Sequence, residues 1–228
     1  MREPINNVVL VHGAWADGSS WAEVIPLLHG VGLRATAVQN PLTSLADDVA
    51  ATNRALSLQD GPTVLVGHSY GGTVITEAGE HPAVAALVFV AALAPEPGEN
   101  YGELAGHFPA APGGEHVRIR DGFAVLDEAG IAECFAQDLS ADRARLLAAV
   151  QGPIAATLFE DRITRAAWRT KPCWYAVSSE DRMIAPDLER FVARRMEATT
   201  IELPAGHASP LTRPREIADL ILAAARGG

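Results

Sequence analysis

Residues 63–72 read TVLVGHSYGG, and this stretch constrains the fold more than any other part of the chain. The β-branched apolar run Thr63–Val66 predicts a buried strand, and Thr73–Ala78 can begin a helix. The intervening G-x-S-x-G motif lets strand and helix approach closely, while Ser69 is held in a strained turn that exposes its hydroxyl. The helix N-terminus behind it offers free N–H groups to an anion. A glycine-rich turn with an incidental serine is the alternative, but this context favours a nucleophile whose product is an oxyanion.

Composition narrows the class of protein. With 228 residues, 48% of them hydrophobic, the chain is long enough for one globular α/β domain with a sizeable core. No apolar run approaches the roughly 20 residues needed to cross a bilayer. The apolar segment Val8–Val11 is too short to be the hydrophobic part of a signal peptide. We therefore expect a cytoplasmic protein that does not bind membranes.

Charge and cysteine content exclude further classes. The net charge of −10 argues against binding to nucleic acids or anionic membranes. Cys134 and Cys173 fit no metal-binding spacing and need no disulfide. We expect no metal and no cofactor, a small-molecule substrate as the binding partner, and a monomer or a homodimer.

Strand and helix patterns alternate along both ends of the chain. The predicted strands are residues 7–11, 33–38, 63–66, 84–90, 173–177 and 199–203. The predicted helices are residues 20–30, 44–58, 73–80, 186–196 and 214–225. The segment Val84–Val90 is almost wholly apolar, which indicates a strand buried on both faces. That pattern is typical of a parallel sheet covered by helices, so the fold class is α/β.

The alternation is interrupted between residues 95 and 169. Prolines and glycines break any long element up to about Gly114, and a mostly helical stretch is expected from about 125 to 160. We predict a core of residues 1–94 and 170–228, with 95–169 as an insertion. Because the insertion leaves the carboxyl end of a strand, where ligands bind in open α/β sheets, we expect it to be a lid rather than merely an elaborated connection.

A serine nucleophile needs a base, and the chain has seven histidines. His207 follows the last strand in Leu203–His207, on the same side of the sheet as Ser69, which makes it the candidate base. His68 adjoins the serine in a sharp turn and points elsewhere, so we interpret it as structural. His12 follows the first strand and is expected to fix its loop. Four others are expected at the surface: His29, His81, His107 and His116.

The base in turn needs an acid that orients it. Asp181 follows the strand 173–177, and the next residues, Met183 and Ile184, can anchor its loop in the core. Glu180 and Glu96 remain as alternatives for this role. The order Ser, Asp, His along the chain is the one expected when a G-x-S-x-G turn lies in an α/β sheet.

These residues together resemble the α/β-hydrolase fold family. The motifs that carry the resemblance are His12-Gly13-Ala14, Gly67-His68-Ser69-Tyr70-Gly71-Gly72, the Asp181 loop and Gly206-His207. Within the family the chain is similar to small bacterial hydrolases and to the plant esterase and hydroxynitrile lyase branch. The resemblance covers essentially the whole chain. It implies a mostly parallel six-stranded sheet with helices on both faces and a helical lid from about Pro95 to Arg169.

The resemblance also implies the parts of the site. Backbone N–H groups of Ala14 and Tyr70 are expected to form an oxyanion hole, in agreement with their places after the first strand and after the nucleophile. We predict a serine hydrolase that cleaves small carboxylic esters or lactones through an acyl-enzyme on Ser69. Aromatic residues that can line a substrate pocket, or equally form the core of the lid, are Trp15, Tyr101, Phe108, Phe123, Phe135 and Phe159.

Three other functions are compatible with this scaffold: a hydroxynitrile lyase, a hydrolase of carbon–carbon bonds and a non-catalytic ligand receptor. In the resembling lyases a lysine directly follows the catalytic histidine and a threonine lies in the first loop. Here Ala208 follows His207, and the first loop has Gly13. A cation that would stabilise departing cyanide is therefore missing from the pattern, which favours ester hydrolysis.

Overall fold

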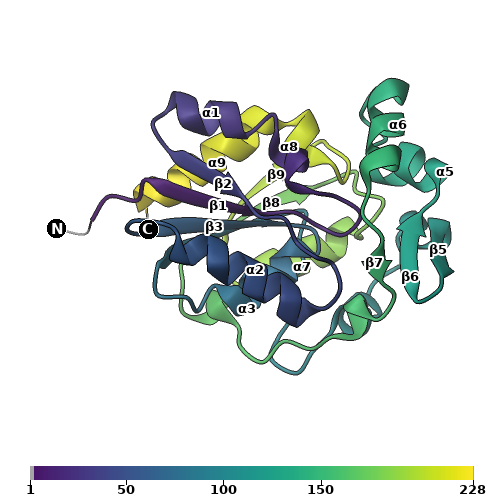
Figure 1. The fold of residues 1–228 in the computed structure, drawn as a ribbon, viewed down its shortest axis with the longest axis horizontal. Helices are drawn as coiled ribbons and strands as arrows, with labels where there is room; N and C mark the ends of the chain where they lie inside the picture. Colours follow the sequence, from purple (N-terminus) through teal and green to yellow (C-terminus); the bar gives the residue numbers. More distant parts are fainter. Residues whose placement is uncertain (1–2, 228) are drawn as a thin grey trace.

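The computed structural model describes residues 3–227 and is built around a six-stranded parallel sheet (Figure 1). In spatial order the strands are β2 (Arg34–Ala37), β1 (Asn7–Val11), β3 (Thr63–His68), β4 (Val84–Val90), β8 (Cys173–Ser178) and β9 (Thr199–Leu203). All six lie where the sequence predicted strands, which confirms the α/β fold class. Along the chain the strand order reverses at β1, since β2 lies on one side of it and β3 on the other. The loops that follow β1 and β3 therefore diverge at a topological switch point, where open α/β sheets bind ligands.

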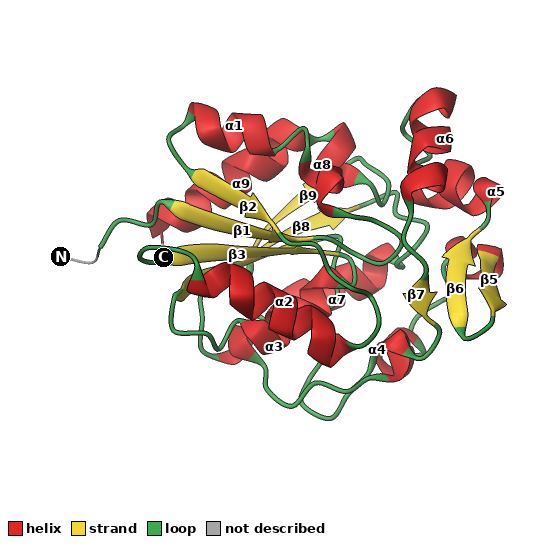
Figure 2. Cartoon of the chain, viewed as in Figure 1, coloured by secondary structure: helices red, strands yellow, loops and turns green. Residues whose placement is uncertain are grey.

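Alternate side chains of the strands supply two separate cores. Val9 and Leu65 pack below the sheet against α2 (Leu45–Ser57), α3 (Gly71–Ala78) and α7 (Pro186–Arg195). Val8 and Val64 pack above it against α1 (Ile25–Gly30) and α9 (Pro214–Gly227). Figure 2 shows these two helical layers on either side of the strands. Because each face is covered, Val8–Val11 of β1 and the whole of β4 are apolar on both faces, as the continuous hydrophobic run of β4 predicted.

The helix after the first strand begins later than predicted. Residues Gly18–Trp21 form a 3₁₀ turn, and α1 starts only at Ile25. Asp17 caps the turn by accepting the N–H of Ser19 at 2.6 Å. The start predicted at residue 20 is therefore wrong, because residues 18–21 form this separate capped turn and α1 begins only at Ile25.

The insertion lies at the carboxyl ends of the strands (Figure 1). It carries a three-stranded antiparallel sheet of β5 (Val117–Arg120), β6 (Phe123–Leu126) and β7 (Ile154–Ala155). Its helices are α4 (Tyr101–Ala105), α5 (Glu128–Gly130) and α6 (Ala141–Val150), and a single π turn spans Ile131–Phe135. Only part of the predicted helical stretch is thus helical.

A tight turn explains why strands occur there. Asp121 and Gly122, at the tip of the β5–β6 hairpin, both have positive φ angles, 51° and 80°. This is the backbone of a two-residue hairpin turn, for which Asp-Gly is a preferred sequence. The dipeptide therefore fixes β5 against β6 and limits the helical stretch to residues after Asp127.

Across residues 3–227, no helix has both the length and the apolar character that crossing a bilayer would require.

Candidate active site

The turn after β3 has the strained geometry that the G-x-S-x-G motif predicted. Ser69 has a φ of 55°, a region that non-glycine residues rarely occupy. The strand and α3 approach so closely that a Cβ on Gly67 would lie 2.5 Å from the carbonyl oxygen of Gly71. The serine hydroxyl is consequently presented at the carboxyl edge of the sheet, where it lines a cavity described below.

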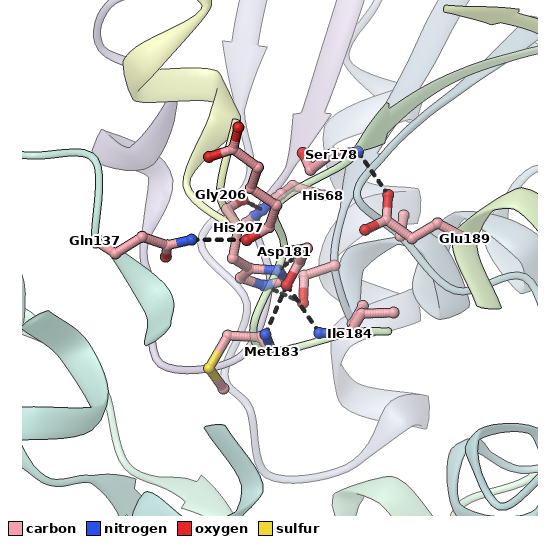
Figure 3. Close-up of polar contacts among 12 residues, drawn as sticks. His68, Gln137, Ser178, Asp181, Met183, Ile184, Glu189, Gly206 and His207 are labelled. Carbon is pink, nitrogen blue, oxygen red and sulfur yellow. Dashed lines mark hydrogen bonds and ion pairs between the residues drawn. The ribbon is translucent and has the colours of Figure 1, made fainter. Parts of the chain in front are cut away.

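Three side chains from three loops meet at this edge, and Figure 3 shows two of them, His207 and Asp181. The Nε2 atom of His207 lies 2.9 Å from the hydroxyl oxygen of Ser69, and its Nδ1 atom lies 2.6 Å from Oδ2 of Asp181. The other carboxylate oxygen of Asp181 accepts the backbone N–H groups of Met183 and Ile184 at 2.6 and 2.9 Å. The carboxylate is thus fixed by its own loop and the imidazole by the carboxylate.

The two alternative acids lie elsewhere. The side chain of Glu180 is exposed, although its neighbour Asp181 is buried. Glu96 forms an ion pair with Arg169 at the surface of the insertion. Of the three carboxylates considered from the sequence, only Asp181 reaches the imidazole of His207.

The oxyanion-hole candidates also lie beside the serine. Within residues 3–227, no hydrogen bond uses the backbone N–H of Ala14 or of Tyr70, and both residues line the same cavity as Ser69. Gly13 permits this arrangement, because a Cβ there would lie 2.7 Å from the Cβ of Ser69. Two free N–H donors are therefore available next to the hydroxyl.

His12 has the loop-fixing contacts expected of it. Its Nδ1 lies 2.8 Å from the carbonyl oxygen of Gly13, and its Nε2 accepts the backbone N–H of Asn40 at 3.0 Å. Burial lowers the pKa of His12, so the ring is neutral and can accept at Nε2. The ring therefore holds the loop that carries Gly13 and Ala14.

His68 is a second structural histidine. Its Nε2 donates to the backbone carbonyl of His207 at 2.8 Å, and its ring lies 4.8 Å from the ring of His207. Burial, and to a smaller extent the positive charge that His207 would carry when protonated, lowers the pKa of His68 to about 3. A neutral His68 thus supports the backbone of the base without competing for its proton.

The insertion also binds the loops of the site. Gln137 donates from Nε2 to the carbonyl oxygen of Glu180 at 2.8 Å, and Asp138 accepts the N–H of Gly206 at 2.5 Å. Nothing in the sequence around Gln137 indicated this role, because the contact joins residues 43 positions apart.

Two buried acids near the site were not predicted either. Glu189 of α7 is fully buried and accepts the N–H of Ser178 at 3.0 Å. Burial and the charge of Asp181 raise the pKa of Glu189 well above its ordinary value, so it is a neutral acid. Asp48 of α2 accepts the hydroxyl of Tyr70 at 2.8 Å, and burial raises its pKa to about 6.

A cavity of about 570 Å³ opens onto Ser69 and His207. Four of the six aromatic residues considered from the sequence line it, namely Trp15, Tyr101, Phe108 and Phe159. Phe123 and Phe135 do not. Phe123 is 45% exposed, and the Phe135 ring packs 5.1 Å from the ring of His207. Across the described residues 3–227, no group of three or more His, Cys, Asp or Glu side chains is placed to hold a metal ion.

Comparison with known proteins identifies the family. Residues 8–220 match the sequence model of the alpha/beta hydrolase family. The chain belongs to the α/β-hydrolase family, and the resemblance seen in its motifs is confirmed. It is 27% identical over 236 residues to a probable hydrolase, R7, of Phoma sp., a match that covers 94% of this chain and 96% of that protein.

Solved structures share the whole fold. A pyrethroid hydrolase from Sphingobium faniae superposes with a TM-score of 0.80 at 19% identity, covering 97% of this chain and 98% of that one. The methylesterase MES16 from Arabidopsis gives a TM-score of 0.79 at 18% identity, covering 98% and 100%. At these identities the likeness establishes the fold alone. The chain is therefore a hydrolase of this family, with esterases among its structural neighbours.

Proposed function

We propose that the protein is a serine hydrolase that cleaves carboxylic esters or lactones through an acyl-enzyme on Ser69. The observation that carries this proposal is the continuous chain of contacts from the Ser69 hydroxyl through His207 to Asp181, at 2.9 and 2.6 Å. These distances are within the range expected of a nucleophile, its general base and the group that orients the base. Names of hydrolases and esterases among the similar proteins are consistent with it.

The proposed reaction has two halves. His207 takes the proton of the Ser69 hydroxyl as its oxygen attacks the carbonyl carbon, and the carbonyl oxygen becomes an oxyanion. The N–H groups of Ala14 and Tyr70 stabilise that charge, each donor being worth about 10²–10³ in rate. His207 then protonates the departing alcohol. Water, deprotonated by the same imidazole, attacks the acyl-enzyme and releases the carboxylic acid.

We further infer that residues 95–169 act as a lid over this site. The cavity supports this role, because its walls come from both the core and the insertion. Leu93 and Ile184 belong to the core, whereas Phe108 and Phe159 belong to the insertion. A lid of this kind excludes water and shapes the substrate pocket.

The lyase alternative has less support. Stabilising departing cyanide requires a positive charge, and no lysine or arginine is among the residues that line the described cavity. Lys171, the single lysine of the chain, donates to the carbonyl oxygen of Val84 at the amino end of β4. We therefore expect no cyanide release from mandelonitrile above the buffer rate.

A labelling experiment tests the proposal. Wild-type protein should react with a fluorophosphonate probe and hydrolyse p-nitrophenyl esters. Ser69→Ala should lose both while keeping its melting temperature, since it removes one oxygen that faces the cavity. Ser209→Ala, which removes a buried hydroxyl outside the proposed triad, serves as the control and should keep both activities. Labelling of Ser69→Ala at the wild-type rate would assign the nucleophile to another residue.

A further inference from the structure

The wall of the cavity at Ser69 is mainly apolar. No Lys, Arg, Asp or Glu is found among the residues that line it within the described chain. The side chains in the wall that carry a hydrogen-bonding group are those of Ser69, His207, Trp15, Tyr70 and Tyr101. Ser69 and His207 already have roles in the proposed reaction. Burying an ionic group without a partner costs several kcal/mol. A substrate with a charged group therefore finds no partner in this cavity.

Four aromatic rings form one side of this wall. Phe159 lies at their centre, with its ring 5.8 Å from that of Trp15, 6.0 Å from that of Tyr70 and 4.9 Å from that of Tyr101. Two of these rings are next to the proposed oxyanion donors. Ala14, the first donor, directly precedes Trp15, and the second donor is the backbone N–H of Tyr70 itself. The aromatic wall is therefore next to the position of the scissile carbonyl.

Three of these rings carry a polar group, and two of the three are bonded within the protein. The Nε1–H of Trp15 donates to the carbonyl oxygen of Ala124 at 3.2 Å, and the hydroxyl of Tyr70 donates to Asp48 at 2.8 Å. The Tyr101 hydroxyl forms no hydrogen bond with any residue from 3 to 227. Burial raises the pKa of Tyr101, as does the charge of Asp181 to a smaller extent, so the hydroxyl stays protonated and can donate.

We propose that this cavity takes bulky, uncharged esters that carry a second hydrogen-bond acceptor, and that the Tyr101 hydroxyl binds that acceptor. The inference rests on the proposed ester hydrolysis and specifies its substrate class. A volume of about 570 Å³ lies within the range of cavities that enclose drug-sized ligands. In such pockets a few polar groups orient a mainly apolar ligand. Tyr101 is the remaining polar group of the described wall that is free to do so.

Matched esters of one chain length test this inference. The set consists of p-nitrophenyl octanoate, p-nitrophenyl octanoates with one ketone at each carbon from 4 to 7, and the mono-p-nitrophenyl ester of octanedioic acid. Wild-type protein should hydrolyse the octanoate and at least one keto ester. Its kcat/KM for the carboxylate ester should be lower than for the octanoate by about 100-fold or more. Tyr101→Phe should lower kcat/KM by about 2- to 12-fold for that keto ester, the loss expected for one neutral hydrogen bond.

Two controls make the result specific. On the octanoate, which has no second acceptor, Tyr101→Phe should change kcat/KM by a smaller factor than on that keto ester. Phe108→Leu changes the apolar wall without removing a polar atom, so it should affect the octanoate and the keto esters equally. Melting temperatures report whether either variant is misfolded.

Three results overturn the inference. The first is that no keto ester distinguishes Tyr101→Phe from wild type, and the second is that the carboxylate ester is hydrolysed as well as the octanoate. In both cases Ser69 still reacts with a fluorophosphonate, so ester hydrolysis itself survives. The third is that wild-type protein neither reacts with the probe nor hydrolyses any member of the set, which overturns the proposed function and this inference with it.

Discussion

Replacing His68 by glutamine should remove a pH-dependent loss of stability. Histidine in an unfolded chain titrates near 6.5, whereas burial lowers the pKa of His68 to about 3 in the folded protein. Between these values the unfolded chain binds a proton that the folded chain does not. Stability is therefore fully present above pH 6.5 and falls as the pH drops, by about 1.4 kcal/mol per pH unit. At pH 5 the loss should be about 2 kcal/mol.

Glutamine is the informative substitution because its Nε2 amide can donate to the carbonyl of His207, as the Nε2–H of His68 does at 2.8 Å. It does not titrate. The pH dependence of wild-type stability alone is ambiguous, because the titration of Asp48 changes the stability in the opposite direction. Its pKa is raised to about 6, so the folded state regains stability as the pH falls through 6 toward 4. The difference between wild type and His68→Gln isolates the histidine.

Urea unfolding at pH 7.5, 6.5, 5.5 and 5.0, followed by tryptophan fluorescence, measures this difference. Between pH 7.5 and 5.0, wild type should lose about 2 kcal/mol more than His68→Gln, equivalent to a shift in melting temperature of roughly 4–8 °C for a domain of this size. His29→Gln, at an exposed histidine, should follow wild type. Parallel pH profiles for wild type and His68→Gln, within about 0.5 kcal/mol, would refute the argument that His68 is buried and neutral.

Three further predictions concern the site. Asp181→Asn should lower kcat by several orders of magnitude, about 10⁴ for the same change in a protease triad, whereas Glu180→Gln should have little effect; steady-state kinetics showing the reverse would give Glu180 the acid's role. Gly13→Ala should slow fluorophosphonate labelling about 10²-fold or more, since its Cβ would displace the serine or the adjacent oxyanion donor, and labelling at the wild-type rate would contradict that geometry. Phe159→Ala should change the preference for acyl length, whereas Phe135→Ala should lower kcat/KM equally for all p-nitrophenyl esters, because only Phe159 lines the cavity; identical length profiles for the two variants would argue against this division.

Most of the sheet and the main members of the site were predictable because their signals are local. Each strand is a short apolar run between turn residues, and each functional candidate follows the carboxyl end of one. Ser69 follows β3, Asp181 follows β8 and His207 follows β9. Carboxyl ends of neighbouring parallel strands lie along one edge of the sheet, so the topology alone brings the three loops to one side.

The buried acids had no such signal. Asp48 occurs among polar residues in the first turns of α2, and Glu189 lies in a helix with charged neighbours at Asp187 and Arg190. In a sequence, acids in these positions are typical of a solvated helix face. Their burial depends on what packs against the helix. For Asp48 that partner is the hydroxyl of Tyr70, and for Glu189 it is the N–H of Ser178, both distant along the chain.

We infer that the insertion, proposed above to be a lid, also supports the loops of the candidate site. Gln137 and Asp138 satisfy backbone groups in the two loops that carry Asp181 and His207. A hydrogen bond typically contributes about 0.5–1.5 kcal/mol, so these contacts stabilise one conformation of each loop. The 2.6 Å contact between Asp181 and His207 depends on both loops at once. A change in the insertion that breaks either contact should therefore alter the geometry of the proposed triad as well as the cavity at Ser69. The insertion is in this sense part of the candidate active site, which a boundary drawn at residue 95 from the sequence alone did not indicate.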